Sequence, residues 1–197
     1  MNDLHELVKN QFSESIQTKI LAADLLLPAL LAAGDKLTEC LLNGHKIMTC
    51  GNGASACDAL RFASQMLTRF KGERPPLPAL ALTADTTAIT AIANNHAYQD
   101  IFAKQIRGLG QSGDVLLVIS TSGNSANILQ AIKAAQDRHI GVVALTSQDG
   151  GKIVELLGES DIEIRVPTND PARSQETNVL IIHCLCDIVD YQLFGQL

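Results

Sequence analysis

The chain has 197 residues, a length typical of one domain or of one domain with an appendage. Hydrophobic residues make up 46% and charged residues 18%, which allows a sizeable core and excludes a disordered or low-complexity protein. The 15 Lys and Arg against 21 Asp and Glu give a formal net charge of −6, and Trp is absent. Direct nucleic-acid binding is therefore disfavoured, because it needs a basic surface or stacking aromatic side chains.

Five cysteines are present, an odd number, and none of them has a CxxC spacing. This pattern indicates buried small side chains, and neither a disulfide scaffold nor a Cys-rich metal site. The N-terminus lacks the basic and apolar regions of a signal peptide, and no run of 18 apolar residues occurs. We therefore expect a cytoplasmic, soluble protein that does not associate with a membrane.

Apolar residues from Leu4 to Leu31 recur at the spacing of an amphipathic helix. Pro28 is expected to end or bend this helix, and residues 35–42 predict a second short helix that closes at Asn43–Gly44. We therefore predict that residues 1–44 form a helical hairpin for oligomerisation, appended to a domain over residues 45–197.

After residue 45 the hydrophobic pattern changes, and short apolar runs alternate with helical stretches. The predicted strands are 46–50, 79–83, 114–119, 141–145 and 162–166, and the clearest helices are 54–70, 126–138 and 175–194. The strands before residue 150 are almost continuously apolar, as expected where both faces of a sheet are covered. The sequence therefore predicts a parallel α/β sandwich.

Two loops between a predicted strand and a predicted helix are chemically distinctive. In a doubly wound sheet, ligands bind at this edge, beyond the carboxyl ends of the strands. The first loop is Gly51-Asn52-Gly53-Ala54-Ser55, whose glycines allow a tight turn and a close approach of the backbone to a ligand. An ordinary turn with Ser55 as helix cap explains the same residues.

The second loop runs from Ser120 to Ser125 and carries four hydroxyl side chains before a helix. Hydroxyls and the free amides of a helix N-terminus make a neutral, hydrogen-bond-donating cradle that suits a phosphate monoester. No Walker A or GxGxxG pattern is present, so nucleotide chemistry is not supported. A capped turn is the alternative, but hydroxyls are denser here than one cap needs.

At these loops the chain resembles the sugar isomerase (SIS) domain family. The segments CGNGASACDA, RPPLPALAL, GDVLLVISTSGNSANI, ALTSQDGGK, DIEIRVP and RSQE are similar to the phosphoheptose isomerase subfamily, over essentially the whole chain. The resemblance implies a flavodoxin-like, five-stranded parallel sheet and a homotetramer with sites between subunits. It also implies conversion of sedoheptulose 7-phosphate to D-glycero-D-manno-heptose 7-phosphate for lipopolysaccharide heptose synthesis.

The resemblance further implies which residues contact the ligand. The phosphate contacts would be Ser120, Thr121, Ser122 and Ser125, and the remaining sugar-phosphate contacts would be Asn52, Gly53, Ser55, Asn94, Asn95 and Gln175. Asn95 stands where many members carry Asp, which removes one carboxylate from the site.

Isomerases of this family use a Glu and a His for proton transfer, and hold zinc with a His, that Glu, a Gln and the catalytic His. Gln175 and His183 match the Gln and the catalytic His, whereas Arg61 and Gln65 replace the other two. A guanidinium has no lone pair for zinc, and an amide is not a base. We therefore expect a degenerate catalytic site at His183 and Gln65 and no metal, with zinc only if the chain is a working isomerase.

Each of these positions also has an ordinary structural interpretation. His183 lies among Leu and Ile residues and could be a core histidine. Gln65 could be a polar residue on a helix, and Arg61 a solvated or ion-paired surface cation.

Near the C-terminus, Leu193 and Phe194 form an apolar pair that could anchor a partner. A member of the resembled subfamily contacts the replication initiator DnaA through a corresponding pair. Our leading hypothesis is therefore a sugar-phosphate-binding regulator that associates with DnaA. The alternatives are a phosphoheptose isomerase, a sugar-phosphate sensor with another partner, and a pair that merely packs on the core or on a subunit interface.

Overall fold

The computed structural model describes residues 2–195. Met1, Gln196 and Leu197 lie outside the described residues. They are the ends of the predicted segments 1–44 and 45–197. The strands are β1 (Ile47–Gly51), β2 (Ala79–Ala81), β3 (Val115–Ile119), β4 (Gly141–Ser147) and β5 (Ile162–Val166). The helices are α1 (Asn2–Leu42), α2 (Ala54–Leu67), α3 (Thr86–Asn95), α4 (Ile101–Leu109), α5 (Ala126–Gln136), α6 (Ile153–Leu156) and α7 (Pro171–Phe194), with a 3-10 turn, η1 (Tyr98–Asp100).

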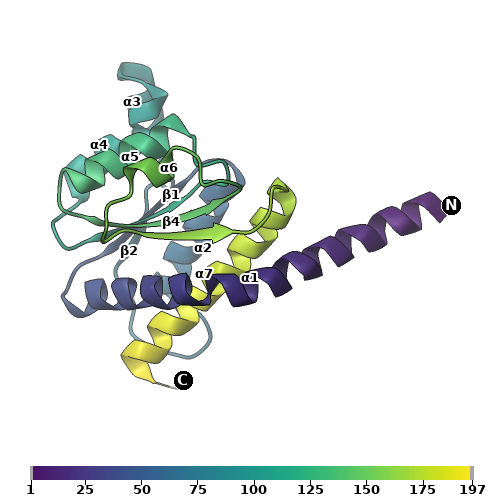
Figure 1. Ribbon diagram of the computed structural model, residues 1–197. Helices are drawn as coiled ribbons and strands as arrows, with labels where there is room; N and C mark the ends of the chain where they lie inside the picture. Colours follow the sequence, from purple (N-terminus) through teal and green to yellow (C-terminus); the bar gives the residue numbers. More distant parts are fainter. Residues whose placement is uncertain (1, 196–197) are drawn as a thin grey trace.

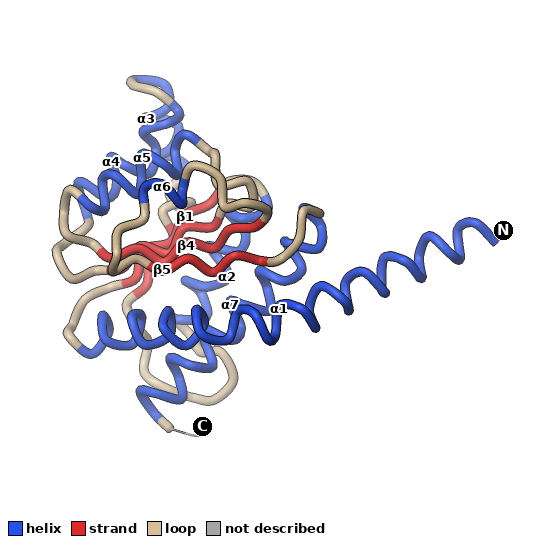
Figure 2. The backbone as a smooth tube through the Cα atoms, viewed as in Figure 1, coloured by secondary structure: helices blue, strands red, loops and turns tan. Residues whose placement is uncertain are grey.

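All five strands pair in parallel, in the order β2-β1-β3-β4-β5 (Figure 2). This is the flavodoxin-like order, so the predicted fold class is confirmed. The expected strands agree with the observed ones to within two residues at each end, and the helices after residue 45 that the sequence missed are α3, α4 and α6. These three are the shortest α-helices of the chain, with 10, 9 and 4 residues.

The sheet separates two apolar cores because successive strand residues point to opposite faces. Leu117 and Ile119 of β3 face the core beneath α1, α2 and α7, whereas Leu116 and Val118 face the core beneath α4, α5 and α6. All five residues of β1 and of β3 are buried. Figure 1 shows the two helical layers on either side of the sheet.

The expected N-terminal hairpin is wrong, because α1 is a single helix of 41 residues that contains Pro28. Proline removes one backbone hydrogen bond, but packing on both sides can hold the helix together. A continuous buried stripe crosses Pro28, with Leu26 before it and Ala33 and Leu37 after it. Gly34 lies so close to Ile188 of α7 that a side chain at position 34 would collide with it. Tertiary contact therefore overrides the local preference for a break.

The first half of α1 extends away from the rest of the molecule as an arm (Figure 1). Its large apolar side chains are at least half exposed, and we call this set the arm stripe: Leu4, Leu7, Val8, Phe12, Ile16 and Ile20. By length and composition alone, α1 and α7 would each be able to cross a membrane. Helix α7 meets that test as a core helix, since Ile181, Ile182 and Leu185 are buried against the sheet.

A buried guanidinium joins α2 to α7. Arg74 donates from Nε to Asp190 Oδ1 at 2.6 Å, and its side chain is fully buried. Its two other nitrogens donate to the carbonyl oxygens of Gln65 and Met66 at the end of α2, at 2.9 and 2.8 Å. One side chain therefore satisfies the free carbonyls of a helix C-terminus and pairs with the next helix.

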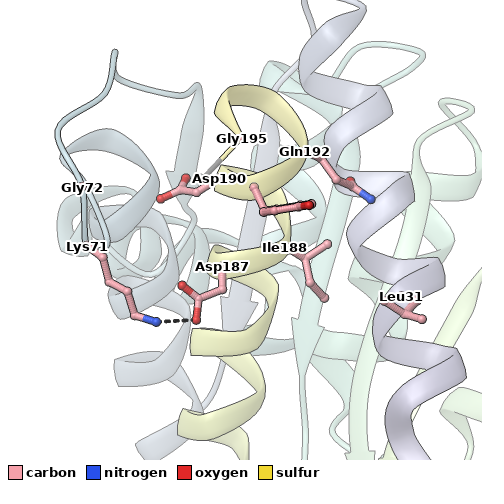
Figure 3. A pocket seen from close by; sticks show the side chains of 9 residues that line it. Leu31, Lys71, Gly72, Asp187, Ile188, Asp190, Gln192 and Gly195 are labelled. Atoms are coloured by element: carbon pink, nitrogen blue, oxygen red, sulfur yellow. Dashed lines mark hydrogen bonds and ion pairs between the residues drawn. The ribbon is translucent and has the colours of Figure 1, made fainter. Parts of the chain in front are cut away.

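We expect Asp190→Ala to lower the free energy of unfolding by about 3–5 kcal/mol, because it leaves the Arg74 charge buried without its partner. The matched control is Asp187→Ala, which breaks the exposed ion pair between Lys71 Nζ and Asp187 Oδ2 shown in Figure 3. That change should cost no more than about 1 kcal/mol. Urea unfolding followed by circular dichroism measures both, and equal losses would contradict the role assigned to Arg74.

Candidate phosphate-binding site

The two loops singled out in the sequence meet at the carboxyl edge of the sheet. Gly51, the last residue of β1, is in register with Ile119, the last residue of β3, so the two chains leave the sheet side by side. Together they form a pocket of about 150 Å³. It is lined by Asn52, Ser55, Ile119, Ser120, Thr121, Ser122 and Ser125. Except for Ile119, all of these were predicted ligand contacts.

The segment Ser120–Ser125, here called the phosphate loop, presents hydrogen-bond donors without a formal charge. Gly123 has a φ of 63°, and its amide donates to Ser120 O at 3.2 Å, which closes a tight turn. Ser125 precedes α5 but makes no side-chain cap bond, so its hydroxyl is free to meet a ligand. No Lys or Arg lines the pocket. The loop can therefore bind an anion through hydroxyls, amides and the dipole of α5.

An amide pair joins the two loops. Asn52 Nδ2 donates to Asn127 Oδ1 and Asn127 Nδ2 donates to Asn52 Oδ1, each at 2.8 Å, and Tyr98 OH donates to the same Asn52 oxygen at 3.3 Å. Asn127 is 2% exposed, and the sequence reasoning missed it, because a single Asn near a helix start carries no distinctive signal. The pairing leaves one N–H of the Asn52 amide for a sugar hydroxyl.

Helix α2 carries three polar residues on neighbouring turns beyond Ser55. Gln65 is turned toward α7, where its Oε1 accepts a bond from Cys186 Sγ at 3.3 Å. Arg61 is exposed and forms no ion pair within residues 2–195. Asp58 is 5% exposed, and burial raises the pKa of its carboxyl, while the nearby Arg61 charge partly opposes the shift. Sequence reasoning missed Asp58, whose burial is a tertiary property.

Gln175 and His183, the two residues of α7 that match the family pattern, lie in different surroundings. His183 is half-buried and its ring packs on Phe70, with the ring centroids 5.1 Å apart. Gln175 is exposed, and eight residues of helix place it about 12 Å from His183 along the axis. Neither residue lines the phosphate pocket within this single chain.

The residues at the family zinc position do not fit zinc. A structural or catalytic zinc ion needs imidazole, thiolate or carboxylate ligands, and Arg61 and Gln65 supply a cation and an amide. The Gln65 oxygen is also already engaged by Cys186. Among residues 2–195, no group of three or more His, Cys, Asp and Glu side chains is arranged to hold a metal.

The other predicted contacts lie around the rim or further away. Gly53 has a φ of 55° and caps α2 beside the pocket. Asn94 and Asn95 are exposed at the end of α3, and neither lines the pocket. Leu193 and Phe194 are half-buried and pack against the core that α1 and α7 cover, so this pair is not a free apolar anchor.

A model of the SIS domain matches residues 11–147. A phosphoheptose isomerase from Coxiella burnetii is 58% identical over 97% of this chain and 96% of its own. Solved structures of phosphoheptose isomerases superpose closely. The one from Francisella tularensis has a TM-score of 0.93, 47% identity, and coverage of 96% and 99% of the two chains. The one from Neisseria gonorrhoeae has a TM-score of 0.90, 46% identity, and coverage of 95% and 98%.

The chain is a SIS-domain protein. More narrowly, it belongs to the phosphoheptose isomerase family.

These relatives correct the leading hypothesis from the sequence. A DnaA-associating regulator is not supported, because the similar proteins are named phosphoheptose isomerases over nearly their full length. The hypothesis gave most weight to Arg61, Gln65, Asn95 and the Leu193–Phe194 pair. These few positions count for less than the similarity along the whole chain. The packing of Leu193 and Phe194 on the core also removes the argument from that pair.

We expect the double change Ser120→Ala with Ser122→Ala to weaken binding of inorganic phosphate by at least roughly a hundredfold. Each hydroxyl would donate to a charged oxygen, a bond that contributes about 1.5–3 kcal/mol. Titration calorimetry of the wild type and the variant measures the effect. The control is Ser112→Ala, an exposed serine just before β3 at the opposite edge of the sheet. Unchanged phosphate affinity in the double variant would contradict the role of these two hydroxyls in phosphate binding.

Proposed function

We propose that this protein binds a sugar phosphate in the phosphate loop and isomerises it, with sedoheptulose 7-phosphate as the substrate. The observation that carries the proposal is the similarity to the Coxiella burnetii phosphoheptose isomerase over 97% of the chain. The hydroxyls that line the phosphate loop agree with it, since they suit the phosphate end of such a ligand.

The isomerisation moves one proton between neighbouring carbons and one between their oxygens, so the product has the same atoms as the substrate. We assign the carbon proton transfer to His183, because histidine is the commonest group in general acid–base catalysis. No hydrogen bond engages its ring within residues 2–195. At positions 61 and 65 the chain lacks the two zinc ligands that the family resemblance implies. We therefore propose a reaction without zinc.

A second candidate function is sugar-phosphate binding without turnover, in a sensor with a partner protein. Arg61 and Gln65 favour it, because a neutral amide cannot act as the general base that typically contributes about 10²–10⁴ in rate. Both candidates share the phosphate loop and differ only in the fate of the bound sugar.

We expect wild-type protein to convert sedoheptulose 7-phosphate faster than His183→Ala does. The double variant Arg61→His with Gln65→Glu should gain roughly a hundredfold in rate and retain zinc, measured by mass spectrometry of the metal content. A matched control is Leu60→His with Ser64→Glu, which puts the same pair at the same spacing on a neighbouring face of α2, turned by about 100°. Wild-type turnover no faster than His183→Ala would overturn the isomerase proposal in favour of binding alone.

We also propose that the protein is a cytoplasmic homotetramer that contacts other copies through the arm stripe. An apolar face of this length on a projecting helix is covered in most proteins by another chain. A groove of about 510 Å³ lies further along α1, beside Leu31, Ile188 and Tyr191 (Figure 3). The five cysteines are all free in the structure, which agrees with a reducing compartment.

We expect Phe12→Glu with Ile16→Glu to convert the tetramer into smaller species, because two charges would enter an apolar interface. Both side chains are exposed within one chain, at 68% and 54%, so the chain itself should still fold. Light scattering after size exclusion measures the mass. The control is Leu109→Glu, which changes a leucine that is 50% exposed at the end of α4. A wild-type monomer would contradict the proposal.

A further inference from the structure

The phosphate loop rests on a second loop that does not line the pocket. Residues Gln148–Lys152, here called the support loop, connect β4 to α6. At its end, the amide of Ile153 donates to Gly123 O at 3.1 Å, and the amide of Lys152 donates to Asn124 Oδ1 at 3.2 Å. Asn124 Nδ2 in turn donates to Ser122 O at 2.7 Å. The shape of the phosphate loop therefore depends on where the support loop lies.

The two loops touch through glycine backbones and leave no space between them. Gly123, Gly150 and Gly151 all have positive φ, at 63°, 79° and 56°. A side chain at Gly123 would collide with the carbonyl of Gly150, and one at Gly151 would collide with the carbonyl of Ser122. Because the two backbones are in close contact and are joined by the bonds from Lys152 and Ile153, we expect a displacement of the support loop to displace the phosphate loop as well.

A carboxylate from β5 fixes the support loop from its other side. Glu163 Oε1 accepts bonds from Thr146 Oγ1 at 2.6 Å and from Arg165 Nε at 2.9 Å, and Oε2 accepts from Arg165 Nη2 at 2.5 Å. The Glu163 side chain is 17% exposed. It lies against Gly150, where any added side chain would collide with the carboxylate. Three hydrogen bonds hold this carboxylate in one orientation, so it limits how far Gly150 can move toward β5.

A buried hydroxyl adds a second support at the other end of the loop. Ser147 is 1% exposed, and its Oγ donates to Thr121 O at 2.8 Å. This bond joins the end of β4 directly to the phosphate loop. Ser147 and Glu163 thus act on the phosphate loop from two neighbouring strands.

We propose that Glu163, held by Arg165 and Thr146, is a positioning residue that keeps the phosphate loop in its binding shape through Gly150 and Gly151. The inference rests on the proposed binding of a phosphate ester at that loop. Glu163 itself makes no contact with the pocket, so its effect is transmitted entirely through the support loop.

The test compares Glu163→Ala, Glu163→Gln and Ser147→Ala in the full chain. Glu155→Ala is the matched control, because Glu155 is an exposed glutamate on α6. We expect the Kd for sedoheptulose 7-phosphate to rise roughly tenfold in Glu163→Ala. The rise should be smaller in Glu163→Gln, which keeps the acceptor for Thr146, and absent in Glu155→Ala. If the variants turn over, KM should rise while kcat changes little.

A second readout does not depend on any ligand. We expect hydrogen exchange of residues 121–125 to be faster in free Glu163→Ala and Ser147→Ala, while exchange in α2 and α7 stays at the wild-type rate. If wild-type protein fails to bind the sugar phosphate, the proposed function falls, and exchange alone decides this inference. Wild-type exchange at residues 121–125 in Glu163→Ala would overturn it, as would unchanged affinity in that variant.

Discussion

The parallel pairing of β1 with β3 is the constraint on which the site depends. Five register pairs, from Ile47 with Val115 to Gly51 with Ile119, lie in the buried centre of the sheet. Because the next strands lie on opposite sides of this pair, the chain leaves β1 and β3 toward opposite faces and opens a crevice at their ends. The hydroxyls of the phosphate loop and the Asn52 amide meet there. Any slip in this register would separate the two loops.

The helices that carry the remaining polar residues are held by a different contact. Arg74 joins the end of α2 to Asp190 of α7, and so brings the Arg61–Gln65 face near the helix that carries His183. The chain thus has the fold of the phosphoheptose isomerase family, with a guanidinium at position 61 and an amide at position 65. Neither of these two side chains lines the pocket of the phosphate loop. The phosphate loop and this polar face of α2 are therefore held in place by different contacts.

The limits of prediction from sequence follow the same division. Apolar runs and hydroxyl-rich turns depend on near neighbours, so the five strands and the phosphate loop were predictable. The N-terminal hairpin was not, because contacts of α1 with α7 and the sheet outweigh the local effect of Pro28. The sequence did not predict Asn127, Asp58 or Glu163 for a related reason, since the role of each depends on its three-dimensional surroundings. The regulator hypothesis failed because a few substitutions were given more weight than similarity along the whole chain.

The sequence by itself determined the parallel α/β architecture and the uncharged, hydroxyl-rich character of the phosphate loop, since these follow from residue type and spacing. Only the tertiary structure decided that α1 is one helix, that Leu193 and Phe194 pack on the core, and that glycine backbones couple the support loop to the phosphate loop. These features depend on which distant residues meet. Burial and steric contact between separate elements are set by packing, and no local pattern encodes them.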